Sequence, residues 1–271
     1  MHDPGPAFRA LHAPGNPFVL ANCWDVGSAR VLAALGAQAI GTSSAGYAFT
    51  LGQPDSSLTL EQALTHAAEI VAATPLPVSG DFENGYADDP DDVAETVKLA
   101  FEAGLAGISI EDNKPDRTPY DRALAAERIK AAAAAARALP RDFVLVARAD
   151  GMLNGKYDIE EALARLKAFD EAGADCIYGP IPPTWDDLAR IVQSTEKPVN
   201  ALAAGSFASY SKDDFARIGV ARISLGSGFA RAAQRRLIDI FSEIMEDGDF
   251  SSLKKTVSGA EVDEMLRKFM G

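Results

Sequence analysis

The sequence predicts an α/β protein of the (β/α)8 barrel class, and three observations support this fold class. A segment with helical spacing, a glycine and then a β-rich run follow one another four times along the chain. Four further β-rich runs follow a proline, so the runs total eight. The length of 271 residues suits a single barrel. We therefore expect one domain over residues 1–271, with a C-terminal helical extension over about 229–271.

Glycine ends the segment before four of the runs. Only glycine takes the left-handed conformation after a helix at little cost, so each glycine predicts a helix end followed by a strand. The glycines are Gly36, Gly104, Gly173 and Gly219, and the runs that follow them are 39–42, 107–110, 176–178 and 222–225.

Proline precedes the other four runs, since a strand tolerates proline before its hydrogen-bonded ladder begins. These runs are 18–20, 78–80, 143–146 and 199–201, and the clearest helical segments are 90–101, 123–139, 159–172 and 213–218. Alternating strands and helices favour a parallel sheet. An open doubly wound sheet is the alternative, but residues 22–28 after the first run lack a glycine-rich dinucleotide loop.

Composition and charge exclude several classes of protein. The formal net charge is −13, which repels phosphate backbones, so we expect no nucleic-acid partner. No apolar run approaches the roughly 20 residues of a membrane span, and residues 1–16 lack the apolar core of a signal peptide. The two cysteines, Cys23 and Cys176, fit free thiols in a reducing cytoplasm, where we expect the protein to reside.

The tail from residue 229 onward is longer than one closing helix needs. Leu237, Ile240, Phe241 and Ile244 form one helical stripe, and a second amphipathic segment, 262–269, follows a polar break. An extra apolar helix on a closed barrel predicts packing on another subunit; capping of the barrel is the alternative.

Acidic residues stand at the ends of two neighbouring predicted strands, where barrels carry their chemistry. Asp81 and Glu83 are two residues apart and share a face of an extended chain, while Glu111 ends the next strand. Three converging carboxylates repel unless a cation lies among them, and a hard divalent ion such as Mg²⁺ fits. The alternative is that such acids cap the next helix, which suits residues 88–91 better.

A cation and several small residues stand at other strand ends. Arg148 suits a bidentate carboxylate or a developing oxyanion; the alternative is a structural ion pair with Asp150 or Glu111. Backbone amides of residues 42–46 could face an anion, as more weakly could residues 226–228. No histidine stands at a strand end, which disfavours a histidine base and a zinc site. No lysine stands within a strand, which disfavours a Schiff-base aldolase.

Residues 18–230 resemble the isocitrate lyase and phosphoenolpyruvate mutase superfamily. The stretch Asp81-Phe82-Glu83-Asn84-Gly85-Tyr86 is similar to its metal loop, Glu111-Asp112 to its second acidic motif, and 146–150 to the segment of its substrate arginine. The resemblance implies a divalent metal, Mg²⁺ or Mn²⁺, held by Asp81 directly and by Glu83 and Glu111 through water. It also implies a homodimer or homotetramer that swaps its last helix between subunits.

The resemblance implies roles for further residues. Arg148, Asp55 and Glu111 would be catalytic, with Asp55 near the metal. The residues expected to bind the substrate are Ser43, Ser44, Ala45, Asp81, Arg148 and Asn200. Asn200 is inferred from its strand position alone. The cysteine- and histidine-bearing loop of the family's lyases is absent, because residues 113–120 contain neither residue, and residues 179–181 lack the histidine after strand six.

The expected function is therefore Mg²⁺-dependent cleavage of a C–C bond in a small 2-oxo or 2-hydroxy (di)carboxylate, through a pyruvate-enolate-like intermediate. Oxaloacetate decarboxylation or a methylisocitrate-lyase-like reaction would fit. One alternative is P–C bond chemistry on a phosphonopyruvate-like substrate, as in phosphonopyruvate or carboxyphosphonate mutases. Another is a barrel that binds an oxo acid without catalysis.

Overall fold

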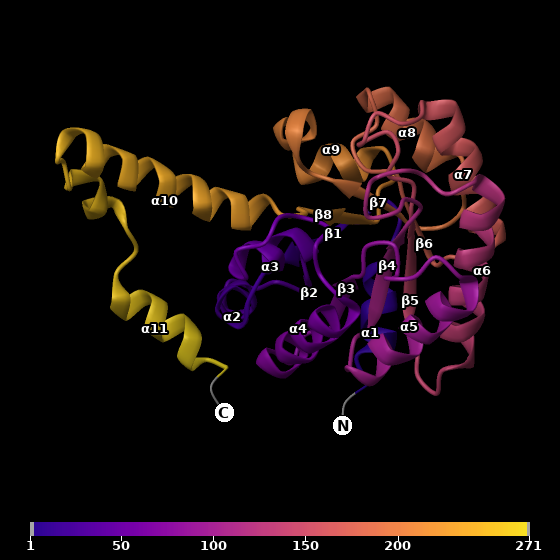
Figure 1. Cartoon of the computed structure of the whole chain (residues 1–271), viewed down its shortest axis with the longest axis horizontal. Coiled ribbons are helices and arrows are strands. Elements are labelled where there is room, and N and C mark those ends of the chain that lie inside the picture. The colour runs from indigo at the N-terminus through magenta and orange to yellow at the C-terminus, as the bar shows by residue number, and fades with distance from the viewer. Residues whose placement is uncertain (1–2, 270–271) are drawn as a thin grey trace.

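The computed structural model describes residues 3–269 and confirms the closed barrel (Figure 1). Across this part of the chain eight parallel strands pair in sequence order, and the last strand pairs with the first. The strands are β1 (Phe18–Asn22), β2 (Ala39–Gly41), β3 (Val78–Asp81), β4 (Gly107–Glu111), β5 (Val144–Arg148), β6 (Cys176–Tyr178), β7 (Val199–Leu202) and β8 (Arg222–Ser224). The open-sheet alternative is therefore wrong.

Helices surround the barrel and connect its strands. They are α1 (Gly5–Leu11), α2 (Val26–Ala34), α3 (Ser44–Thr50), α4 (Leu60–Ala73), α5 (Pro90–Glu102), α6 (Arg122–Ala138), α7 (Ile159–Glu171), α8 (Trp185–Gln193), α9 (Lys212–Arg217), α10 (Gly228–Asp247) and α11 (Gly259–Arg267). The four glycines expected to end helices all have a φ between 93° and 101°, and Asp89 caps α5 as predicted. Helix ends and strand starts thus follow local residue chemistry.

Helix α1 lies within the leader segment, for which the sequence predicted no element. Its Phe8 is fully buried and joins the cluster of side chains from the barrel strands, including Phe18. His12 packs edge-on against both aromatic rings, with centroid distances of 4.8 and 5.0 Å. The leader is therefore part of the core, because Phe8 is buried among the barrel side chains and Leu11 packs against the same cluster.

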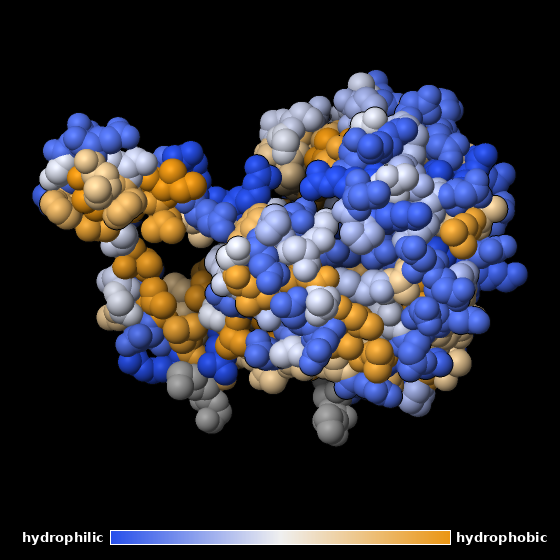
Figure 2. All heavy atoms as spheres, viewed as in Figure 1, coloured by the Kyte–Doolittle hydropathy of each residue, from blue (hydrophilic) through white to orange (hydrophobic). Residues whose placement is uncertain are grey.

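The tail forms an arm. Helix α10 projects away from the barrel and α11 returns beside α2 (Figure 1). Apolar side chains gather on this arm (Figure 2), and the large exposed ones are Phe229, Leu237, Ile238, Phe241, Met245, Phe250, Leu253 and Val257. Helix α10 does not lie over the barrel, whereas α11 contacts α2 of the barrel. Packing of the arm against another subunit and capping by its last helix both stay predictions.

Within residues 3–269, no helix combines the length and the apolar character that crossing a bilayer requires.

Candidate active site

A cavity of about 480 Å³ opens at the carboxyl ends of the barrel strands. Most of the residues predicted for the site line it, namely Ser43, Ser44, Ala45, Asp55, Asp81, Glu83, Glu111 and Arg148. The cavity continues between the strands to Leu20, Ser79 and Arg222. The sequence-based location of the site at the strand ends thus coincides with this cavity.

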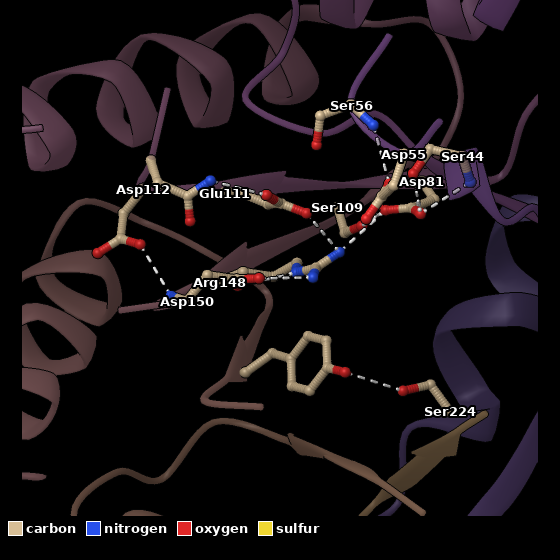
Figure 3. A network of polar contacts seen from close by, with 12 residues as sticks. Ser44, Asp55, Ser56, Asp81, Ser109, Glu111, Asp112, Arg148, Asp150 and Ser224 are labelled. Carbon is tan, nitrogen blue, oxygen red and sulfur yellow. Dashed lines mark hydrogen bonds and ion pairs between the residues drawn. The ribbon is translucent and has the colours of Figure 1, made fainter. Parts of the chain in front are cut away.

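Arg148, at the end of β5, is surrounded by carboxylates (Figure 3). Its Nε and Nη2 donate to the two oxygens of Asp150, at 3.1 and 2.7 Å. Its Nη1 lies 2.9 Å from Asp81 Oδ1 and 3.0 Å from Glu111 Oε1. The ion pairs considered as an alternative for this arginine are therefore present, and they hold its guanidinium at the cavity wall.

Asp81, at the end of β3, accepts several hydrogen bonds. Ser44 donates to Asp81 Oδ2 from its backbone nitrogen at 3.0 Å and from its hydroxyl at 2.8 Å. Ser43 accepts from the backbone of Gly46 and caps α3. The amide and hydroxyl expected to face a substrate anion thus face the carboxylate of Asp81 in this structure.

Glu83 reaches the cavity by a different route from the one predicted. Strand β3 ends at Asp81, and Glu83 has a left-handed φ of 45°, so the two acids do not share the face of an extended chain. Glu83 Oε1 is buried and has no hydrogen-bond partner. Burial, then the charges of Asp81 and Asp55, raises the pKa of Glu83 to about 8.

The three predicted metal ligands do not form a complete coordination sphere. Within residues 3–269, no group of three or more Asp, Glu, His or Cys side chains is arranged to hold a metal ion. The guanidinium of Arg148, bonded to both Asp81 and Glu111, provides the positive charge between them. The donors still fit Mg²⁺, which needs only one or two carboxylates beside its waters, and the unpartnered Glu83 oxygen is such a donor.

Two predicted residues lie at the margins of the site. Asp55 is on the exposed loop after α3 and contacts Arg117 at 3.5 Å. Asn200 is fully buried and does not line the cavity, and its amide donates to Ser224 Oγ at 2.9 Å. Direct substrate binding by Asn200 is therefore not supported, because neighbouring strands cover its side chain.

The structure adds three charged residues that the sequence did not assign to the site. Asp150 orients Arg148, and Asp112 in turn accepts from the Asp150 backbone at 2.8 Å and from Arg165 at 3.1 Å. Arg222 lies deeper in the cavity. A guanidinium inside an apolar β-rich run was the sequence signal for Arg222, since a buried strand seldom carries a charge.

The chemical groups of the lining are limited. The polar groups of the lining are carboxylates, arginines, amides, hydroxyls and one tyrosine. Among the described residues, no histidine, cysteine or lysine lines the cavity. Burial raises the pKa of Tyr178 to about 12, so its phenol stays protonated at neutral pH. The arrangement can neutralise a developing negative charge but has no thiol, imidazole or amine for acid–base or Schiff-base chemistry.

The cavity lies at the carboxyl ends of the strands of a (β/α)8 barrel, where enzymes of this fold carry their active sites. Sequence comparison gives the family. The family model described as phosphoenolpyruvate phosphomutase matches residues 8–245. The chain belongs to this family, within the isocitrate lyase and phosphoenolpyruvate mutase superfamily.

Relatives in the family include lyases, oxaloacetate decarboxylases and a carboxyvinyl-carboxyphosphonate phosphorylmutase. The chain is 35% identical to the oxaloacetate decarboxylase of Paraburkholderia xenovorans over 203 residues, covering 69% of this chain and 64% of the relative. It is 29% identical to the 2-methylisocitrate lyase of Salmonella typhimurium over 260 residues, covering 92% and 87%. A crystal structure from Burkholderia cenocepacia, provisionally assigned as a lyase/mutase, has a TM-score of 0.93 at 42% identity, covering 99% of this chain and 96% of that chain.

Proposed function

We propose that this protein is a Mg²⁺-dependent enzyme that cleaves a C–C bond of a small 2-oxo or 2-hydroxy dicarboxylate, and that decarboxylation of an oxaloacetate-like acid is its reaction. The observation that carries the proposal is the pairing of a fixed guanidinium, Arg148, with a cavity lining free of thiol, imidazole and amine. This lining suits a cleavage that needs charge stabilisation and no acid at the departing carbon.

The proposed reaction breaks the bond between the 3-carbon and its carboxylate. Carbon dioxide leaves, the electron pair remains on the three-carbon fragment as an enolate, and water later returns a proton to that carbon. Asp150 holds Arg148 by two hydrogen bonds, leaving Nη1 directed at the cavity acids. That nitrogen would donate to the enolate oxygen, and such preoriented donors typically contribute several kcal/mol to catalysis.

Mg²⁺ would be held by Asp81 directly and by Glu83 and Glu111 through water. When bound, a divalent cation supplies positive charge beside the 2-oxo oxygen and so stabilises the enolate. The protein's contribution is the acid-rich wall, where burial raises the pKa of Glu83 and of Glu111. Raised pKa values mean that these carboxylates lack sufficient compensating charge, a deficit that a cation removes.

The relatives include both lyases and a mutase. An oxaloacetate decarboxylase and a 2-methylisocitrate lyase are similar to this chain, and so is a carboxyvinyl-carboxyphosphonate phosphorylmutase. The choice of a lyase therefore rests on the residues of the cavity. Of the two lyase activities, decarboxylation fits better, since the loop 113–120 has no cysteine or histidine to act as an acid.

P–C bond chemistry on a phosphonopyruvate-like acid is the second candidate. Residues Gly226, Ser227 and Gly228 line the cavity at the start of α10, and Ser227 makes no side-chain capping bond there. The free amides of such a helix start suit a phosphonate. A barrel that binds an oxo acid without catalysis is the third candidate. Measured turnover of any substrate would rule it out.

The test is pyruvate release from oxaloacetate, phosphonopyruvate and methylisocitrate, each with Mg²⁺ and with excess EDTA. We expect Mg²⁺-dependent release from oxaloacetate, and loss of it in Asp81→Ala. Conversion of phosphonopyruvate alone, to pyruvate and phosphate by hydrolysis or to phosphoenolpyruvate by phosphoryl migration, would favour the second candidate. Binding of all three acids without any turnover would favour the third.

A further inference from the structure

Arg222, the first residue of β8, is a buried cation without a partner. Only 4% of the residue is exposed, and its Nε and Nη1 are fully buried with no hydrogen-bond partner. Across residues 3–269, no carboxylate lies within ion-pair distance of its guanidinium, although its side chain lines the cavity. A buried charge left in this state is strongly unfavourable, so it requires an anion or ordered water.

The other buried arginines of the barrel have hydrogen-bond partners. Arg165 pairs with Asp112 at 3.1 Å and with Glu161 at 2.8 Å, and Arg148 has three carboxylate partners. Arg128 has no carboxylate partner and its Nε is unpartnered, but its other nitrogens donate to backbone oxygens, including Ala87 O at 2.8 Å. Among these buried arginines of the described residues, only the guanidinium of Arg222 makes neither an ion pair nor a hydrogen bond.

Among the described residues, the side chains next to Arg222 are uncharged or lie beyond ion-pair distance. Cys176 is fully buried, and burial raises the pKa of its thiol to about 12, so it is neutral. The register sets Asn200 directly opposite Arg222, yet the two side chains form no hydrogen bond and Asn200 Oδ1 is itself unpartnered. The neighbouring polar groups can complete a hydrogen-bond network but cannot neutralise the cation.

The strand register relates Arg222 to the proposed reaction centre. Arg148 pairs with Tyr178, Tyr178 with Asn200, and Asn200 with Arg222, so one row of residues crosses β5 to β8. Both arginines line the same cavity. Three carboxylates of the protein pair with Arg148, whereas within residues 3–269 no carboxylate pairs with Arg222.

We infer that Arg222 binds a second anionic group of the substrate and so selects dianionic acids over monoanionic ones. The inference rests on the proposed function and deepens it, because it assigns the far end of the substrate to the base of the cavity. A carboxylate suits the guanidinium, which can donate two parallel hydrogen bonds to it.

The test compares wild type, Arg222→Met and Arg222→Lys by calorimetric titration with malonate, a dianion, and pyruvate, a monoanion, at constant ionic strength with Mg²⁺. We expect Arg222→Met to weaken malonate binding by roughly 10- to 100-fold, the usual effect of losing a hydrogen bond to a charged group, and pyruvate binding by much less. Arg217→Met, on exposed α9, removes the same charge away from the cavity and should leave both affinities unchanged.

Malonate affinity equal to wild type in Arg222→Met would mean that the guanidinium holds only water, and the inference would be wrong. Should that variant not fold, Arg222→Lys decides: lysine lacks the planar fork, so weaker malonate binding supports the inference and unchanged binding overturns it. Loss of malonate binding in a protein that turns over no substrate leaves Arg222 as an anion site and rejects only the proposed function. Oxaloacetate turnover by the wild type, together with an unchanged malonate affinity in Arg222→Met, would keep the proposed function and reject the inference about Arg222.

Discussion

Asp150 accepts two hydrogen bonds from Arg148, its neighbour two residues earlier, at 2.7 Å to Nη2 and 3.1 Å to Nε. This side-on contact uses one edge of the guanidinium and leaves Nη1 for the cavity. Asp150 is itself held, because its backbone nitrogen donates to Asp112 Oδ1 at 2.8 Å. The pair therefore fixes the direction of the charge that the proposed reaction needs.

Asp150→Asn should lower turnover by at least about tenfold with a smaller change in KM. The amide cannot accept both hydrogen bonds, so the guanidinium loses its orientation and part of its transition-state contact. Steady-state pyruvate release measures the effect. Glu160→Gln, which breaks an exposed ion pair with Arg190, is the control. Equal turnover in the two variants would contradict a positioning role for Asp150.

Mg²⁺ should raise the thermal unfolding midpoint of the wild-type protein, because a ligand that binds only the folded state stabilises it. Asp81→Asn should abolish most of this rise, since it removes the proposed direct ligand. Thermal unfolding with EDTA, Mg²⁺ and Mn²⁺ gives the measurement without requiring a substrate. An unfolding midpoint that is the same with EDTA, Mg²⁺ and Mn²⁺ would show that the acid-rich wall binds no divalent cation.

The apolar arm should hold subunits together, and we propose a homodimer or homotetramer. Phe241 is 59% exposed and Leu237 is 68% exposed on α10. Phe241→Arg should shift the protein toward monomer, because it places a charge in an interface that excludes water. Size-exclusion chromatography with light scattering reads the mass. Glu246→Arg, about 140° round the helix, is the control, and a monomeric wild type would refute the proposal.

His66 should make the fold less stable in acid. Burial lowers its pKa to about 4, whereas an unfolded histidine titrates near 6.5. Below pH 6.5 this histidine is therefore protonated in the unfolded chain but stays neutral in the folded chain. The free energy of unfolding consequently falls as the pH drops toward 4. His66→Phe keeps the stacking on Tyr47, whose ring centroid is 3.9 Å away.

That variant should flatten the dependence of unfolding free energy on pH by at most about 1.4 kcal/mol per pH unit between pH 6.5 and 4. Urea unfolding at several pH values measures the slope, with pH 8 as the reference where both side chains are neutral. Parallel curves for the two proteins would contradict the buried neutral state of His66.

Phe8→Ala should destabilise the barrel by about 3–5 kcal/mol, the usual cost of deleting a buried phenylalanine ring. Its side chain is fully buried beside Phe18, with a centroid distance of 6.1 Å. Leu35→Ala, at a side chain that is 69% exposed, should change stability by less than about 0.5 kcal/mol. Urea unfolding compares the two; similar losses would argue against α1 as part of the core.

Much of the fold could be predicted from residues that are close together in the sequence. A left-handed glycine such as Gly104 ends a helix wherever it stands, and a run such as 107–110 with its own β preference forms the strand that follows. Acids at strand ends also predicted where the cavity lies, because all strands of a parallel barrel point their carboxyl ends the same way. Helix α1 escaped detection, since seven residues with one buried phenylalanine carry little periodic signal.

Local residues were enough to predict the succession of strands, the helix ends and the charged residues at the barrel mouth, because each depends on residues close together in the chain. How those charges are shared emerges in the folded barrel. Arg148 pairs with acids from β3, β4 and its own strand end, while within residues 3–269 Arg222 pairs with no carboxylate. A charge is compensated through space over a few ångströms, and the register between strands sets which side chains come that close.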